Sequence, residues 1–178
     1  MSATARAERS ETTVRRWVEK TLGWEEGRAD VVRVPHLGTP SFDFFVVSQR
    51  RLAPAGDIYV MTDGSAALPP GRENLAKVLA REGFPLNPSA IPAAQLAELF
   101  LRMAAVRPGR VIAEASDFAL RSLEEDARAS FAPPRVESEC THAVLTFWAA
   151  GLDPTHVERW RVEVAADGSL ADESETIA

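Results

Sequence analysis

Cysteine is almost missing from this sequence, since Cys140 is the one cysteine among 178 residues. A single thiol cannot close an internal disulfide, so a disulfide-stapled secreted domain is excluded and packing must hold the fold. Spacings that hold zinc, such as C-x-x-C or H-x-x-x-H, do not occur either. We therefore expect no metal site and no cofactor.

Long hydrophobic runs are also missing. The most apolar stretch, residues 91–106, is interrupted by Gln95, Glu98 and Arg102, and it is shorter than the roughly 20 residues that cross a bilayer. Residues 1–13 hold no apolar core of the kind that a secretory signal needs. We expect a cytoplasmic chain with no membrane partner.

Positive charge is in deficit, with 20 Lys and Arg against 26 Asp and Glu and a net charge of −6. Such a chain is repelled on average by nucleic-acid phosphates, so no nucleic-acid partner is expected. The glycine-rich loops that cradle nucleotide phosphates, G-x-x-x-x-G-K-[ST] and G-x-G-x-x-G, are absent. Because 46% of the residues are hydrophobic and 26% are charged, the composition is typical of a globular domain.

Apolar residues recur at helical spacing in four segments. The first helix is expected over about 11–22, with Ser10 as its N-cap and Gly23 after its last turn. A second helix is marked around 75–79 and ends at Gly83, and a third begins near Pro92. A fourth is capped at 116–117 and runs to about 127.

Extended segments with β-branched and aromatic residues alternate with turn signals. Three of them, at 30–34, 42–48 and 57–62, predict an antiparallel meander whose middle strand is apolar on both faces. A short strand is expected at 110–113. The strongest hairpin signal joins 136–148 to 156–165, and the second of these strands alternates apolar and charged residues.

These elements predict an α+β fold, with one antiparallel sheet of about five to six strands packed against three to four helices. The expected organisation is a flexible N-terminus at 1–9, a single domain at 10–170 and a flexible acidic tail at 171–178.

Two groups of polar residues could carry chemistry. Cys140 and His142 stand two apart on an expected strand and therefore share a face, but zinc needs three or four ligands and a thiolate needs a closer base. His36 could approach Asp43 and Asp63 if the meander forms, but turn chemistry is the favoured explanation for both His36 and Asp63.

Trp148 is the aromatic residue most suited to a contact surface, because it ends an expected strand beside a loop. It shares its face with Thr146, His142 and Cys140, which are of mixed polarity. The candidate binding residues are Tyr59, Cys140, His142, Thr146, Trp148 and His36. The rival interpretation is that this face mediates self-association through the open sheet.

The order of a helix, a three-stranded meander and further helices is similar to that of small acidic secretion chaperones and immunity proteins. That resemblance implies a protein that binds one protein partner and often dimerises. The acidic charge, the strongly patterned sheet and the lack of a convergent set of polar residues favour a non-catalytic adaptor. The alternative is a small enzyme or a small-molecule receptor with a pocket between sheet and helices, lined by Tyr59, His142 and Trp148 with His36 nearby.

Overall fold

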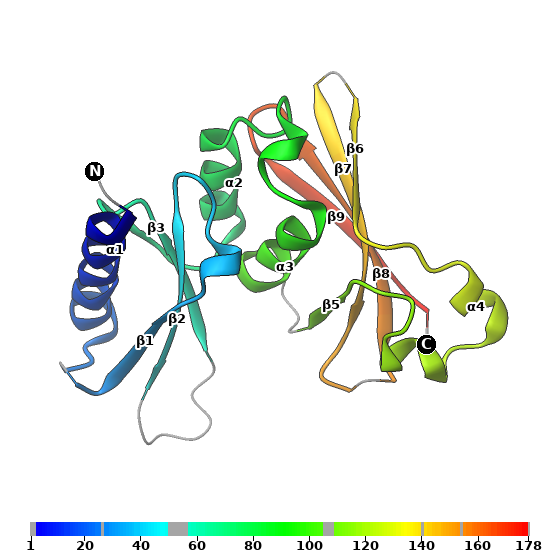
Figure 1. Cartoon of the computed structure of the whole chain (residues 1–178), viewed down its shortest axis with the longest axis horizontal. Helices are drawn as coiled ribbons and strands as arrows, with labels where there is room; N and C mark the ends of the chain where they lie inside the picture. Colours follow the sequence, from blue (N-terminus) through cyan, green and yellow to red (C-terminus); the bar gives the residue numbers. More distant parts are fainter. Residues whose placement is uncertain are drawn as a thin grey trace.

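The structure, a computed structural model, describes residues 3–25, 27–49, 57–104, 109–139, 141–153 and 155–177. The fold class is α+β with antiparallel sheets, as the sequence predicts. The strands form two sheets rather than one: sheet A has the order β1-β2-β3-β4, and sheet B has the order β5-β7-β8-β9 with β6 also paired to β7. Helices α2 and α3 lie between the two sheets (Figure 1).

Sheet A confirms the predicted meander. Its first three strands are β1 (Ala29–Arg33), β2 (Asp43–Gln49) and β3 (Ile58–Thr62), and the two-residue β4 (Ala67–Leu68) extends the sheet. The central strand β2 is covered on both faces, because Phe44 packs toward α3 and Phe45 packs toward α1. The apolar run at 42–48 therefore correctly predicted a strand that is covered on both faces.

Helix α1 (Ala3–Trp17) covers the outer face of sheet A and begins earlier than expected. Its first turns contain no apolar stripe, so hydrophobic periodicity could not reveal them. Alanine, arginine and glutamate there nevertheless favour helix. Ser10 is consequently a fully buried mid-helix residue and not an N-cap. A π-helical turn follows and ends at Gly23, whose φ of 67° confirms the predicted stop.

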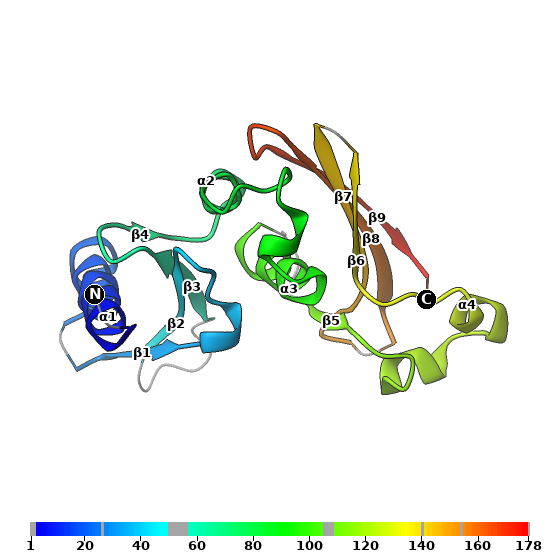
Figure 2. The ribbon, with the colours of Figure 1, turned by 45° about the horizontal axis from the view of Figure 1, so that its top comes forward.

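Two helices fill the middle of the molecule (Figure 2). Helix α2 (Arg72–Arg81) and helix α3 (Ala93–Met103) match the predicted second and third helices. The largest core cluster contains Phe44 of sheet A, Phe100 of α3 and Phe147 of sheet B, so the two sheets pack on the same helices in one continuous core. None of the described helices is both long and apolar enough to cross a lipid bilayer.

Sheet B differs from the predicted hairpin at two places. Its strands are β5 (Arg110–Ile112), β6 (Arg135–Glu139), β7 (His142–Ala150), β8 (Val157–Ala165) and β9 (Leu170–Thr176). The segment expected as one strand at 136–148 is two paired strands, with Glu139 opposite His142. The expected acidic tail is mostly strand β9, which pairs with β8 over its whole length.

Strand β9 presents few apolar residues, so the sequence pattern predicts a tail where the structure has a strand. Leu170 packs against the main core, while the remaining residues are held by the β8 ladder and by cross-strand ion pairs. Strand β9 forms a hairpin with the preceding strand β8 across the turn at 166–169, and this pairing leaves little trace in the hydrophobicity of β9 itself.

The expected fourth helix is a 3₁₀ turn, Phe118–Ser122, followed by the short helix α4 (Glu125–Ala129). Asp117 caps the turn by accepting a hydrogen bond from the Ala119 amide at 2.9 Å. This segment covers one end of the outer face of sheet B, which is the face turned away from α3, and it encloses a second core cluster around Trp148. The rest of that outer face stays open.

Candidate functional site

The predicted binding residues fall into separate places. Tyr59 lies on sheet A beside α3, whereas Thr146 and Trp148 lie on the outer face of sheet B. The hypothetical pocket that combines Tyr59 with His142 and Trp148 is therefore not assembled. The reason is the parity of β7: Ala143, Leu145 and Phe147 face α3, so the residues between them point the other way.

Tyr59 and His36 are connected through α3 by a chain of polar contacts. Arg102 donates a hydrogen bond to the Tyr59 hydroxyl at 2.9 Å, and its guanidinium lies over the Tyr59 ring at 5.0 Å. Arg102 also pairs with Glu98 at 2.8 Å. His36 is exposed, and its Nε2 lies 3.8 Å from Glu98 Oε2. The helix therefore fixes the orientation of Tyr59 at the surface.

A surface hollow of about 420 Å³ opens beside Tyr59, and we name it the Tyr59 hollow. It is lined by Tyr59, Leu101, Arg102, Gly109, Arg110, Phe118, Gly151 and Leu152. Phe118 and Leu152 are 57% and 84% exposed, which makes them two of the four large exposed hydrophobic residues in the described part of the chain. Two such side chains at one hollow form an exposed apolar patch.

Arg110 links Phe118 on the rim of the Tyr59 hollow to Asp117. The Arg110 guanidinium lies 5.0 Å from the Phe118 ring and forms a bidentate pair with Asp117 at 2.5 and 2.6 Å. The Arg110 hydrogen bonds hold the pKa of Asp117 below its ordinary value, although burial opposes them. Arg110 is thereby kept over the ring, and Phe118 is held at the surface.

A larger hollow of about 610 Å³ lies on the outer face of sheet B, and we name it the arginine hollow. Its lining residues are Ser130, Ala132, Arg135, Glu137, Val144, Thr146, Trp148, Arg159, Trp160, Arg161, Glu173, Ser174 and Glu175. Thr146 sits at its centre in a cross-strand row between Arg135 on β6 and Arg161 on β8. The sequence predicted Thr146 and Trp148 for this face, and both line the hollow.

Charges in the arginine hollow are nearly balanced. Arg159 pairs with Glu175 at 2.5 Å, and Arg161 lies 3.7 Å from Glu173 on the same neighbouring strand. Arg135 pairs with Glu137 at 3.1 Å. These pairs are exposed to solvent, so they give a mixed polar surface and contribute little to folding.

Trp148 itself is only 1% exposed and packs edge-on against Phe131 at 5.7 Å. The expectation that the mixed polarity of its face would leave Trp148 available is wrong, because the segment around α4 covers it. Its role in the hollow is to close one end. His142, the first residue of β7, is half-buried, and Cys140 lies outside the described residues.

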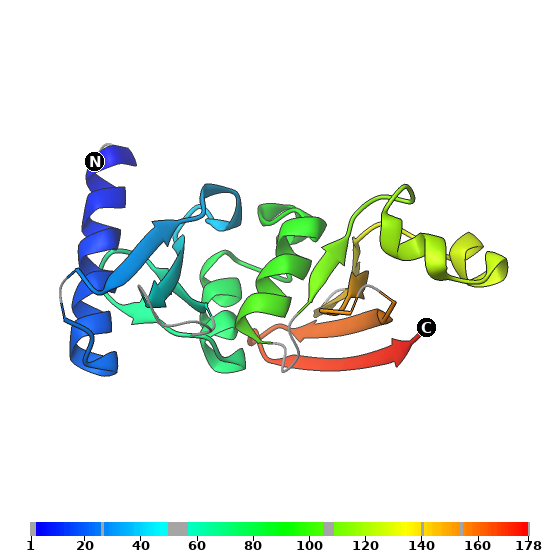
Figure 3. The ribbon, with the colours of Figure 1, turned by 90° about the horizontal axis from the view of Figure 1, so that it is seen from below.

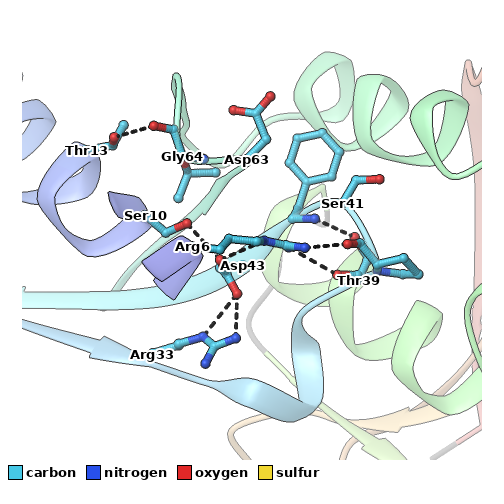
Figure 4. Close-up of polar contacts among 12 residues, drawn as sticks. Arg6, Ser10, Thr13, Arg33, Thr39, Ser41, Asp43, Asp63 and Gly64 are labelled. Atoms are coloured by element: carbon cyan, nitrogen blue, oxygen red, sulfur yellow. Dashed lines mark hydrogen bonds and ion pairs between the residues drawn. The ribbon is translucent and has the colours of Figure 1, made fainter. Parts of the chain in front are cut away.

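Among the described residues, the most deeply buried charge belongs to Asp43 at the interface of α1 and sheet A (Figure 4). Its carboxylate accepts hydrogen bonds from Ser10 Oγ at 2.7 Å, from Arg33 at 2.6 and 3.1 Å and from Arg6 at 3.3 Å. Burial alone would raise the pKa of Asp43, but the bonds from Ser10 and Arg33 and the charge of Arg6 lower it overall. We call these four residues the Asp43 cluster.

The Asp43 cluster is built for structure. Every partner of Asp43 fastens α1 or β1 to the sheet, and Arg6 also donates to the Pro40 carbonyl at 2.5 Å. The predicted approach of His36 to Asp43 and Asp63 does not occur, since His36 contacts Glu98. Asp63 accepts bonds from Ser65 within its own turn, as the turn interpretation predicts.

Within the described residues, no group of three or more His, Cys, Asp or Glu side chains is placed to hold a metal ion. The two hollows are lined by arginine, glutamate, hydroxyl and apolar groups.

Sequence reasoning did not single out Phe118, Leu152 or the two arginines beside them. Phe118 was assigned to a helix and Leu152 to a loop, which are both correct placements in outline. A leucine at the tip of a connection that otherwise holds turn residues is the one local signal that could have drawn attention to that position.

Family models, curated proteins and solved structures were compared with the chain, and none of them matches it.

Proposed function

We propose that the chain is a protein-binding module and that the Tyr59 hollow is the surface that contacts its partner. The observation that carries this proposal is the exposure of Phe118 and Leu152 on the rim of a single hollow. Aromatic residues and arginine dominate the energetics of protein interfaces, and the hollow offers Tyr59, Arg102 and Arg110 beside those apolar groups.

The partner contact would be led by apolar anchors. A partner side chain that enters the hollow meets Leu101 and the Tyr59 ring, while Arg102 and Arg110 stand at the rim for carboxylates or backbone carbonyls. Both arginines already have acidic partners at Glu98 and Asp117. They therefore add orientation more than net attraction.

The test is a comparison of two leucine variants as bait in the native host. Leu152→Glu places a charge on the rim of the hollow, and Leu86→Glu places the same charge on another exposed leucine that does not line it. Both changes are expected to alter the free energy of unfolding by less than about 0.5 kcal/mol, because both side chains are exposed.

Quantitative mass spectrometry then compares the proteins that co-purify with each bait. The proposal requires a stoichiometric partner that is kept by Leu86→Glu and reduced about tenfold or more by Leu152→Glu, which corresponds to about 1.4 kcal/mol of binding. Equal recovery of every protein with both variants would contradict it.

A second candidate function is small-molecule binding in the arginine hollow. Its volume of about 610 Å³ falls within the roughly 300–1,000 Å³ that ligand sites occupy. Native mass spectrometry of the intact protein tests this candidate. The control is Arg15→Ala, which changes an exposed arginine on α1 far from the hollow. A bound small molecule that is lost in Arg161→Ala and kept in Arg15→Ala would favour this candidate over the first proposal.

A further inference from the structure

Strand β9 forms one margin of sheet B (Figure 3). It pairs with β8 over seven residues, and no other described strand pairs with its far side. The end strands of sheet A are shorter, with five residues in β1 and two in β4. On the other margin of sheet B, β5 has three residues and β6 has five. Strand β9 is therefore the longest edge strand in the described part of the chain, and a long edge is a template for a further strand.

The hydrogen-bond pattern of the β8–β9 ladder shows which backbone groups face outward. The Ala165 amide donates to the Ser169 carbonyl at 3.0 Å, and the Ile177 amide donates to the Val157 carbonyl at 2.8 Å. Inward and outward residues alternate along an antiparallel strand, so every second residue between Ser169 and Ile177 points its amide and carbonyl away from β8. The outward-facing backbone groups belong to Leu170, Asp172, Ser174 and Thr176.

The acidic charge of β9 determines which kind of strand can pair with this edge. The strand contains Asp172, Glu173 and Glu175 and no lysine or arginine. Glu173 and Glu175 are two apart on the open outer face; each pairs on one side with an arginine of β8, and their side chains stay 72% and 61% exposed. A second copy of β9 would bring acidic residues opposite acidic residues, which disfavours pairing, whereas lysine or arginine opposite them favours it.

We propose that β9 binds an extended, basic segment of a partner protein, which adds to sheet B as a strand. Lysine or arginine at two positions spaced two apart lies opposite Glu173 and Glu175, and the backbone of the segment bonds to the outward groups of β9. This surface is on the opposite margin of sheet B from β5, so it is separate from the Tyr59 hollow.

The probe is a synthetic peptide of about ten residues that alternates lysine with threonine, and its control alternates glutamate with threonine. Fluorescence anisotropy with the full chain is expected to show saturable binding of the lysine peptide and at least about tenfold weaker binding of the glutamate peptide. Amide hydrogen exchange is expected to slow at Asp172, Ser174 and Thr176 on binding. Equal binding of both peptides would overturn the proposal.

A backbone variant separates strand addition from general attraction between opposite charges. Ser174→Pro removes one outward amide without touching the β8 ladder, and proline is tolerated at such edge positions. Ser174→Ala keeps the amide and is the matched control. The lysine peptide is expected to bind Ser174→Pro about tenfold more weakly than Ser174→Ala, and identical affinities for the two would refute strand addition.

A charge reversal keeps the proposal testable if Ser174→Pro does not fold. In the double variant Glu173→Lys/Glu175→Lys, the preference is expected to invert, so that the glutamate peptide binds more tightly than the lysine peptide. A preference for the lysine peptide that survives the reversal would contradict the assigned positions. Neither result bears on Leu152→Glu, so this proposal and the Tyr59 hollow stand or fall separately.

Discussion

The two sheets bear their charges in different ways. In sheet A, covered by α1 on one face and by α3 on the other, the main ionic group is the buried Asp43 cluster. In sheet B, the outer face is only partly covered, and the pairs Arg159–Glu175 and Arg161–Glu173 are open to solvent. The same residue types therefore fasten a helix in one region and form solvent-exposed pairs in the other.

Replacement of Asp43 tests this comparison with the largest expected effect. Asp43→Ala leaves the buried Ser10 hydroxyl and two arginines without their acceptor, so we expect a loss of about 3 kcal/mol in the free energy of unfolding. Glu173→Ala, the matched change on sheet B, is expected to cost less than about 0.5 kcal/mol. Urea denaturation of both variants measures the difference, and similar losses would show that the two regions do not differ in this respect.

A pair of glycines gives an intermediate effect. Gly168, which precedes β9, has φ +82°, and a Cβ there would lie 2.6 Å from the Ala76 carbonyl oxygen of α2. Gly27, which precedes β1, has φ +84° with nothing within 4 Å. We expect Gly168→Ala to destabilise by about 2 kcal/mol and Gly27→Ala by about 1 kcal/mol, because only the first adds a clash to the left-handed strain.

Thermal and urea unfolding of the two glycine variants check this expectation. Equal losses in the free energy of unfolding for the two variants would contradict the expectation. They would show that the close approach of the β8–β9 turn to α2 does not contribute to stability.

Acid titration gives the smallest effect and probes the Asp43 cluster alone. The pKa of Asp43 is lowered in the folded state, so its contribution is complete above the unfolded pKa of about 3.9 and is lost as the pH falls through the folded value. We therefore expect the stability difference between the native chain and Asp43→Asn to be constant from pH 7 to about 5 and to shrink below about 4. A difference that persists unchanged to pH 2.5 would contradict this assignment.

Several elements could be predicted from the sequence because their signals are local. The meander of sheet A, helices α2 and α3 and the alternation along β8 each follow from periodicity and from glycine or proline at their ends. The division of the strands into two sheets left no local signal. It depends on α3 packing against both, which is a long-range arrangement.

The candidate surfaces were predicted in part. Strand parity correctly placed Thr146 and Trp148 on one face, whereas Tyr59, which was expected to share a pocket with Trp148, lies at a separate hollow beside α3. Parity could not tell that the segment around α4 would cover Trp148, nor that Phe118 and Leu152 would meet near Tyr59. These residues lie far apart along the chain, and their proximity results from tertiary packing.

By itself the sequence determined the α+β class, most of the helix and strand positions and the alternation of apolar and polar faces, because backbone geometry ties each of these to neighbouring residues. Tertiary structure alone decided which charges became buried and which apolar side chains stayed exposed. Ser10 contacts Asp43 only because α1 packs on sheet A. Strand β9 is an edge only because it pairs with β8 on one side. Burial and exposure depend on what packs against a residue, and that is a property of the whole fold.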